Sequence, residues 1–107
     1  MVRERSMNPN ESAIEAEIQA KGKTAPRLTP ADIDAAIVGE QYWNPPGTTL
    51  TVCTLTLRNG FSVIGESACA SPENFDENLG RRIAFDNARG KIWALEGYRL
   101  RSEMSAK

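Results

Sequence analysis

The sequence predicts a small single domain of the α+β class, in the order helix, β-hairpin and long helix, with a flexible N-terminal arm. Three observations predict it: a threonine and a proline open a helical pattern at residue 29, β-branched segments flank an Asn-Gly pair, and apolar residues then recur at helical spacing. The 107 residues suit one domain. We expect an arm over residues 1–27, an α-β-β-α domain over 28–101 and a frayed tail over 102–107.

The N-terminal arm is polar and charged, and its first ten residues do not resemble a signal peptide. Residues 10–20 are compatible with a short helix, because Ile14 and Ile18 lie four positions apart. Residues 21–26 have the composition of a linker. Two interpretations stay open: a mobile arm with a frayed helix, or an arm that docks on a partner or a neighbouring subunit.

The first helix of the domain is predicted over residues 30–42. Thr29 is suited to the N-cap and Pro30 to the first helical position. Asp32 follows the cap by three residues, where an acidic side chain favours the positive end of the helix dipole. The Asn-Pro-Pro-Gly segment at 44–47 ends the helix.

A β-hairpin is predicted over residues 48–69 around Asn59–Gly60, the preferred pair for a two-residue type I′ turn. That turn fixes the register, because each strand residue then has one partner. The expected pairs include Thr56 with Val63, Leu55 with Ile64 and Cys53 with Glu66. Both faces of this hairpin are partly apolar, so helices are expected to cover one face and a symmetry mate the other.

The two cysteines, Cys53 and Cys69, are expected to point to opposite faces of the hairpin, too far apart to form a disulfide. We expect two buried thiols in a reducing compartment. The alternative is a reactive Cys53 beside Glu66, although a neighbouring carboxylate opposes formation of the thiolate.

The long helix is predicted to begin at Ser71–Pro72 and to end at Gly97 in a left-handed cap. Gly80 and Gly90 allow close backbone approach, or the helix breaks near Gly90. Two apolar stripes on opposite sides indicate burial between the hairpin and a further surface, and hence an oligomer. One stripe contains Phe75, Leu79 and Ile83, and the other contains Ala84, Phe85, Ala88, Ile92 and Leu95.

Basic residues concentrate at the C-terminal end, whereas the whole chain has a net charge of −1. Arg81, Arg82 and Arg89 form a candidate anion site, because guanidinium groups recognise phosphates. Arg82 and Arg89 lie seven residues apart on one flank, and Arg81 is expected at a subunit boundary. Three aromatic residues are candidates for stacking on a base: Tyr42, Trp43 and Phe75. The alternatives are a solvated helix face and aromatic residues that belong to the core.

No catalytic constellation is evident. The chain has no histidine, no glycine-rich phosphate loop and too few cysteines for a structural zinc site. We therefore expect no catalytic residue, no metal, no cofactor and no enzymatic activity. No apolar run approaches the length of a membrane span.

Several segments together resemble a family of small phage proteins, typified by the gene 49 product of phage N4 and the gene 66 product of phage Sf6. They are residues 29–33, 51–61, 65–69, 72–76, 80–81 and 93–98. The resemblance spans roughly residues 28–101. It implies a phage or prophage protein in the bacterial cytoplasm, and it carries no catalytic residue because the family has no established activity.

The function expected from these observations is that of a non-enzymatic, oligomeric phage protein that antagonises or redirects a host pathway by binding. The specific version is the sequestration of a nucleotide signal used in defence. One alternative is a DNA- or RNA-binding accessory factor that uses the basic C-terminal helix. Another is an inhibitor that docks on a host protein through the exposed face of the sheet.

Overall fold

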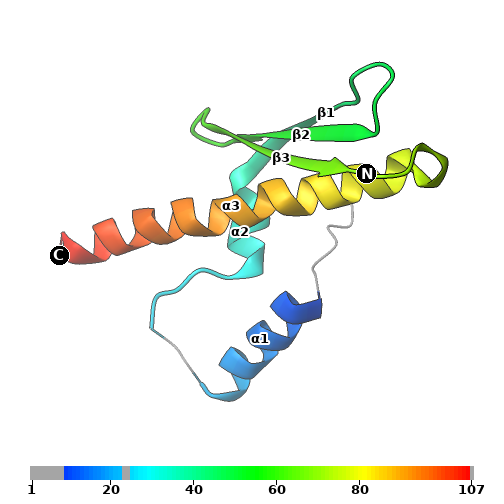
Figure 1. Cartoon of the computed structure of the whole chain (residues 1–107). Helices are drawn as coiled ribbons and strands as arrows, with labels where there is room; N and C mark the ends of the chain where they lie inside the picture. The colour runs from blue at the N-terminus through cyan, green and yellow to red at the C-terminus, as the bar shows by residue number, and fades with distance from the viewer. Residues whose placement is uncertain (1–8, 23–24, 107) are drawn as a thin grey trace.

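The computed structural model describes residues 9–22 and 25–106 and confirms the α+β class. Its helix α3 lies between a three-stranded antiparallel sheet and the N-terminal helix α1 (Figure 1). In chain order the elements are α1 (Pro9–Ala20), α2 (Pro30–Ala36), β1 (Ile37–Trp43), β2 (Leu50–Leu57), β3 (Ser62–Ala68), the 3-10 turn η1 (Pro72–Asn74) and α3 (Glu77–Ser105).

The core lies between the sheet and α3. In β2, burial alternates with every second residue, which is the period of a strand with one face covered. Three of the buried α3 residues, Gly80, Ala84 and Ala88, are small, so the helix and sheet backbones approach closely beside them. The buried core consists of Ile33, Ala36, Ile37, Cys53, Leu55, Leu57, Val63, Ala84, Phe85, Ala88 and Ile92.

The helix predicted over residues 30–42 is wrong in its second half. Its start is confirmed: Thr29 accepts a hydrogen bond from the backbone N–H of Asp32, whose carboxylate accepts one from the N–H of Thr29. The helix ends at Ala36, and the next seven residues form the edge strand β1. Consecutive β-branched residues at Ile37 and Val38 and aromatic residues at the end of this segment favour a strand that pairs with β2.

The hairpin is confirmed, but its predicted register is wrong by one residue. Leu55 pairs with Val63 rather than with Ile64. The turn has three residues, 58–60, and Leu57 and Phe61 close it through a backbone hydrogen bond of 2.8 Å. In this turn only Gly60 has a positive φ, of 90°, as expected for a three-residue loop with a bulge instead of a type I′ turn.

A one-residue change of register exchanges the faces of a strand. The odd-numbered residues of β2 point to the core, and the outer face combines Val52 and Ile64 with Thr54 and Thr56. No helix of the described residues lies over this outer face (Figure 1). The outer face therefore still carries exposed apolar side chains, with Ile64 50% exposed, and the oligomeric state stays a prediction.

The corrected register also changes the surroundings of the cysteines. Cys53 faces Gly65 across the strands, and it is Val52 that faces Glu66. The interpretation of a reactive Cys53 beside Glu66 loses its basis. Cys53 is buried and Cys69 is half-buried, and both are free thiols.

Helix α3 begins later and ends later than predicted. The Ser71–Pro72 signal starts only the 3-10 turn η1, and Asp76 caps α3 by accepting a hydrogen bond from the N–H of Leu79. Gly97 is helical instead of left-handed, and ion pairs of Arg99 support the helix beyond it. The expected frayed tail is thus helical up to Ser105, and α3 does not break at Gly90.

The predicted second stripe of α3 faces the sheet, with Ala84, Phe85, Ala88 and Ile92 buried. In the other stripe Leu79 and Ile83 are exposed. The close approach expected at a glycine of α3 occurs at Gly80, but to a side chain: an added Cβ would lie 2.8 Å from Thr51 Oγ1. Gly90 has no such neighbour.

The edge strand β3 is covered along its open side by α3. Asn87 Nδ2 donates to the carbonyl oxygen of Glu66 at 2.8 Å, and Lys91 Nζ donates to that of Ile64. The opposite edge, β1, has an irregular register between Ile37 and Gly39. Side chains or irregular pairing of this kind protect exposed sheet edges.

The arm predicted over residues 1–27 contains the expected short helix, α1. Residues 1–8, 23, 24 and 107 lie outside the described part of the chain, so the expectation about the first ten residues is not addressed. The flexibility of the arm and the boundaries of the predicted domain stay predictions.

Candidate functional site

The structure brings two of the predicted site residues together at the first turns of α3. The guanidinium carbon of Arg81 lies 5.3 Å from the centre of the Tyr42 ring, within the range of a cation–π contact. Tyr42 points from β1 toward α3, because its strand partner Cys53 is buried in the core. Arg81 also pairs with Glu77, one turn earlier, at 2.9 Å. The contact orients the guanidinium across the ring of Tyr42.

The other predicted site residues are dispersed. Arg82 is exposed and takes no part in the ion pairs among the described residues. Trp43 follows Tyr42 in β1, so it points to the outer face of the sheet, with 62% of its surface exposed. Phe75 is half-buried and lines a cavity of about 200 Å³ at the start of α3.

Arg89 is buried in an ion-pair network instead of facing solvent with Arg82. Its side chain is only 5% exposed, and its Nε donates to Asp34 Oδ1 at 2.9 Å. Its Nη1 donates to Glu11 Oε2 at 2.7 Å, and its Nη2 donates to the carbonyl oxygen of Pro30. Burial opposes the charge of Arg89, but the two carboxylates outweigh it and raise the pKa of this guanidinium above its ordinary value. The network joins α1, α2 and α3.

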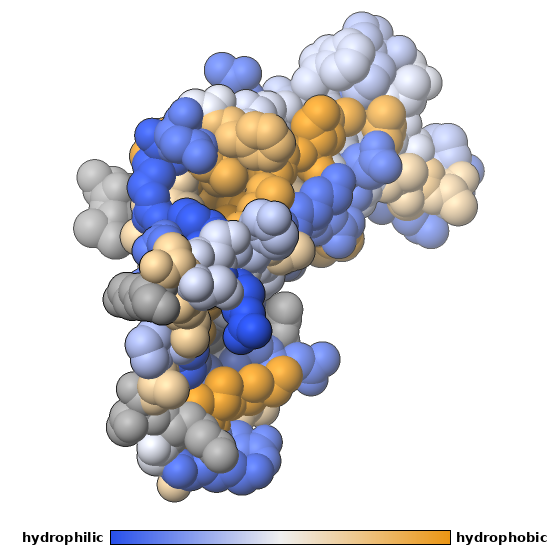
Figure 2. All heavy atoms as spheres, turned by 90° about the vertical axis from the view of Figure 1, so that its left-hand side faces the viewer, coloured by the Kyte–Doolittle hydropathy of each residue, from blue (hydrophilic) through white to orange (hydrophobic). Residues whose placement is uncertain are grey.

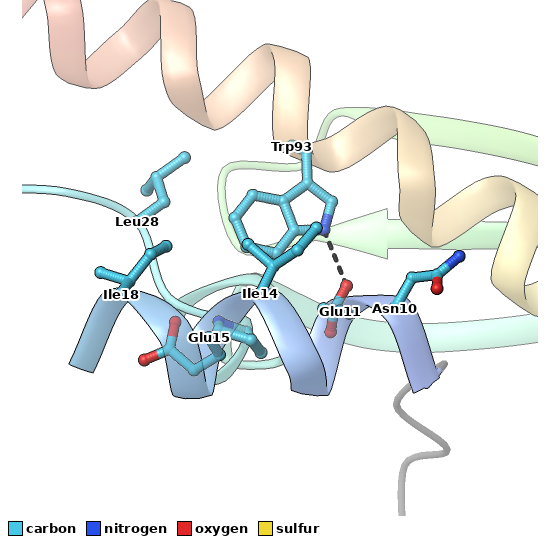
Figure 3. A pocket seen from close by; sticks show the side chains of 8 residues that line it. Asn10, Glu11, Ile14, Glu15, Ile18, Leu28 and Trp93 are labelled. Carbon is cyan, nitrogen blue, oxygen red and sulfur yellow. Dashed lines mark hydrogen bonds between the residues drawn. The ribbon is translucent and has the colours of Figure 1, made fainter. Parts of the chain in front are cut away.

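A second cavity, of about 350 Å³, lies between α1 and α3 (Figure 3). Trp93 of α3 forms one wall, and its indole Nε1 donates to Glu11 Oε2 at 3.1 Å. The lining is mostly apolar, with Ile14, Ile18 and Leu28 facing the indole ring. This size and lining are typical of a binding groove for a small molecule or an apolar side chain.

A further ion pair involves Glu15, which also lines this cavity. Both terminal nitrogens of Arg27 donate to Glu15, each at 2.9 Å. Hydrogen bonding by Arg27, with a further bond from Gln19, lowers the pKa of the Glu15 carboxyl to about 2. The bidentate geometry fixes α1 to the residues that precede α2.

The contribution of α1 could not be found from sequence alone. Glu11 and Arg89 are 78 residues apart, and no local spacing connects them. Glu11 and Trp93 are 82 residues apart, so their contact has no local signal either. The one available signal was the pair Ile14 and Ile18, which indicates a helix with a narrow apolar face but not the surface that it contacts.

The comparisons with known proteins place the sequence in a family. The model of the phage protein family "N4 Gp49/phage Sf6 gene 66" matches residues 28–104, well over half of the chain. The chain belongs to this phage protein family. No curated protein and no solved structure matches it.

The N4 Gp49/Sf6 gene 66 match confirms the resemblance seen in the sequence motifs, and it begins one residue before the Thr29 cap. It contains the Arg81–Tyr42 contact, the Arg89–Asp34 pair and Trp93. Helix α1, with Glu11 and Glu15, precedes the matched residues. None of the described helices has the length and apolar character needed to cross a bilayer.

Proposed function

We propose that this phage-family protein is a non-enzymatic binding protein that captures a phosphate-bearing nucleotide in the cytoplasm of the bacterial host. Capture of a nucleotide defence signal would antagonise a host pathway without any chemical step. The observation that carries the proposal is the Arg81 guanidinium held over the ring of Tyr42.

The chemistry of this contact suits a nucleotide. A guanidinium oriented on one aromatic ring offers its opposite face to a base, because bases stack on arginine planes as well as on aromatic rings. The edge of the same group donates hydrogen bonds to phosphate oxygens. Arg82 is the next residue of α3, and its side chain points about 100° away from that of Arg81 around the helix, so it is not part of the contact with the ligand.

Arg89 is not included in the proposed site. Three of its donors already bind Asp34, Glu11 and the carbonyl of Pro30, so its guanidinium is committed to the fold. The proposed ligand site therefore consists of Tyr42 and Arg81.

The test is a calorimetric titration with cyclic oligonucleotides and, separately, with duplex DNA. Arg81→Ala should weaken binding of the cyclic oligonucleotide about ten- to a hundredfold, the loss of one charge-assisted contact, whereas Arg82→Ala should have a much smaller effect because its side chain points away from Arg81. Arg101→Ala is the matched control, because Arg101 is an exposed arginine on the same helix and its removal changes the net charge equally.

Equal binding by the three variants would contradict the proposal. Tight binding of duplex DNA that weakens steeply with salt, and not of the cyclic oligonucleotide, would replace it by the function of a nucleic-acid accessory factor. Binding of neither ligand would also contradict it and would favour docking on a host protein.

A further inference from the structure

Helix α1 lies in a groove that the family-matched part of the chain provides. We call it the Trp93 groove, formed by Leu28, Pro30, Arg89 and Trp93. Figure 3 shows Ile14 and Glu11 of α1 directed toward Trp93, with Ile18 near Leu28. In the space-filling view α1 forms the lower part of the molecule and carries its own orange apolar stripe (Figure 2).

The groove is prepared for an acidic side chain. Asp34 and the carbonyl of Pro30 hold two donors of Arg89 and thereby orient the third, Nη1, toward α1. The indole N–H of Trp93 points to the same oxygen of Glu11. A guanidinium and an indole N–H that converge on one carboxylate oxygen make a specific contact, because both donors are fixed by packing.

The apolar fit of α1 in the groove is incomplete. Ile14 keeps 57% of its surface exposed, and the cavity of about 350 Å³ remains between the helix and the groove. A 12-residue helix is marginal without tertiary contacts, so the ion pairs of Glu11 and Glu15 supply much of what holds α1 in place.

We infer that the Trp93 groove also receives α1 of a second copy of this chain, so that two copies exchange their N-terminal helices. Each copy carries both the groove and the acidic helix that fits it, and the exchanged helices repeat the contacts of Glu11 and Glu15 with Arg89 and Arg27 of the other copy. Exchange of an identical element closes a two-fold dimer without any new interface.

The exchange requires the chain between α1 and Arg27 to reach from one copy to the other. Six residues, 21–26, form this connection, and a chain of that length spans about 20 Å at most. A short tether gives α1 an effective concentration of about 1 mM at the groove of its own chain. Binding to the groove of a second copy therefore competes with binding in its own chain when the protein concentration approaches that value.

The inference extends the expectation that the protein is an oligomer. It rests on the proposed function only for what such a dimer would do in the host. A monomeric protein that still captures the nucleotide would contradict the exchange and leave the ligand proposal intact. Conversely, exchange without nucleotide binding would leave the dimer and remove the proposed function.

The experiment uses charge reversal on two separate chains. Glu15→Arg and Arg27→Glu each place like charges together in their own groove, whereas a mixture restores two opposite-charge pairs only between chains. Both positions lie outside the core, so each variant is expected to keep the fold. Analytical ultracentrifugation of the mixture should show a heterodimer with a dissociation constant at least about tenfold lower than that of either variant alone.

The matched control is the pair Glu17→Lys and Lys21→Glu. This ion pair joins residues four apart within one chain, so mixing its two variants cannot restore it. Equal association of the two mixtures would overturn the inference, since it would locate the interface elsewhere. A wild-type protein that stays monomeric at about 1 mM would overturn it as well.

Discussion

Gly65 of β3 and Ala88 of α3 meet backbone to backbone. A Cβ atom added to Gly65 would lie 2.2 Å from the amide nitrogen of Ala88 and 2.2 Å from the carbonyl oxygen of Ala84. Neither neighbour is a flexible side chain, so the helix and the strand must separate to admit even a methyl group. This contact fixes the distance between the sheet and α3.

Gly65→Ala is therefore expected to destabilise the protein by about 1–3 kcal/mol or more, the range for overpacking in a core. Gly90→Ala in α3 is the control, because nothing lies within 4 Å of its added Cβ. That variant should be more stable by up to about 1 kcal/mol, since alanine favours a helix. Chemical unfolding followed by circular dichroism measures both, and equal effects would contradict the close approach.

Thr51→Val should stabilise the fold. The Thr51 side chain is buried beneath Gly80, and its hydroxyl oxygen has no hydrogen-bond partner among the described residues. Valine has nearly the same shape and does not bury a hydroxyl, so the free energy of unfolding should rise by about 1 kcal/mol. Thr54→Val on the outer face is the comparison, where a much smaller change is expected.

Arg89→Met should destabilise the protein much more than Arg82→Met. It removes the cation between Glu11 and Asp34 and leaves their carboxylates close together. Breaking a buried pair costs about 3–5 kcal/mol, and we expect roughly 2–4 here because Asp34 keeps 27% of its side chain exposed. Arg82 is exposed, so its variant should stay within about 0.5 kcal/mol of the wild type in thermal unfolding.

The pKa of Glu15 should be measurable by NMR titration of its side-chain carboxyl carbon. Arg27 lowers this pKa from the ordinary 4.5 to about 2. A lowered pKa in the folded state means that the pair stabilises the docked α1 above pH 4.5, and that this contribution is lost as the pH falls toward 2. In Arg27→Ala the pKa should return toward 4.5; an unchanged low value would show that Arg27 is not the cause.

The two cysteines should differ in their reactivity toward iodoacetamide. Cys53 has no exposed surface, whereas Cys69 is half-buried at the end of the hairpin. Mass spectrometry of the native protein should therefore find the first label on Cys69, with both thiols labelled after unfolding. Faster labelling of Cys53 would contradict the corrected register of the hairpin.

Local signals in the sequence predicted local structure well. The cap of α2 depends on Thr29 and Asp32, which are three residues apart, and the structure has both of their hydrogen bonds. The hairpin was predicted but its register was not, because a glycine with positive φ at position 60 suits both a two-residue and a three-residue turn. The choice between the two turns depends on which face of the two strands is buried against α3.

Structure that depends on distant residues was not predicted. Strand β1 was taken as the end of a helix, because its apolar residues are compatible with either period until β2 supplies the hydrogen bonds. At the candidate site, the sequence pointed to the arginines themselves, but it did not predict which side chains surround them. The ion-pair partners of Arg89 lie in α1 and α2, and the aromatic ring that contacts Arg81 belongs to β1.

The cover that Asn87 and Lys91 give to strand β3 bears on how the protein behaves when it is abundant. An open strand edge is a template on which further chains add and fibrils grow. Here two side chains of α3 already bind carbonyl oxygens along that edge. The proposed capture of a ligand needs many copies of the protein, and these two bonds leave fewer open carbonyl groups along β3 with which another chain could pair.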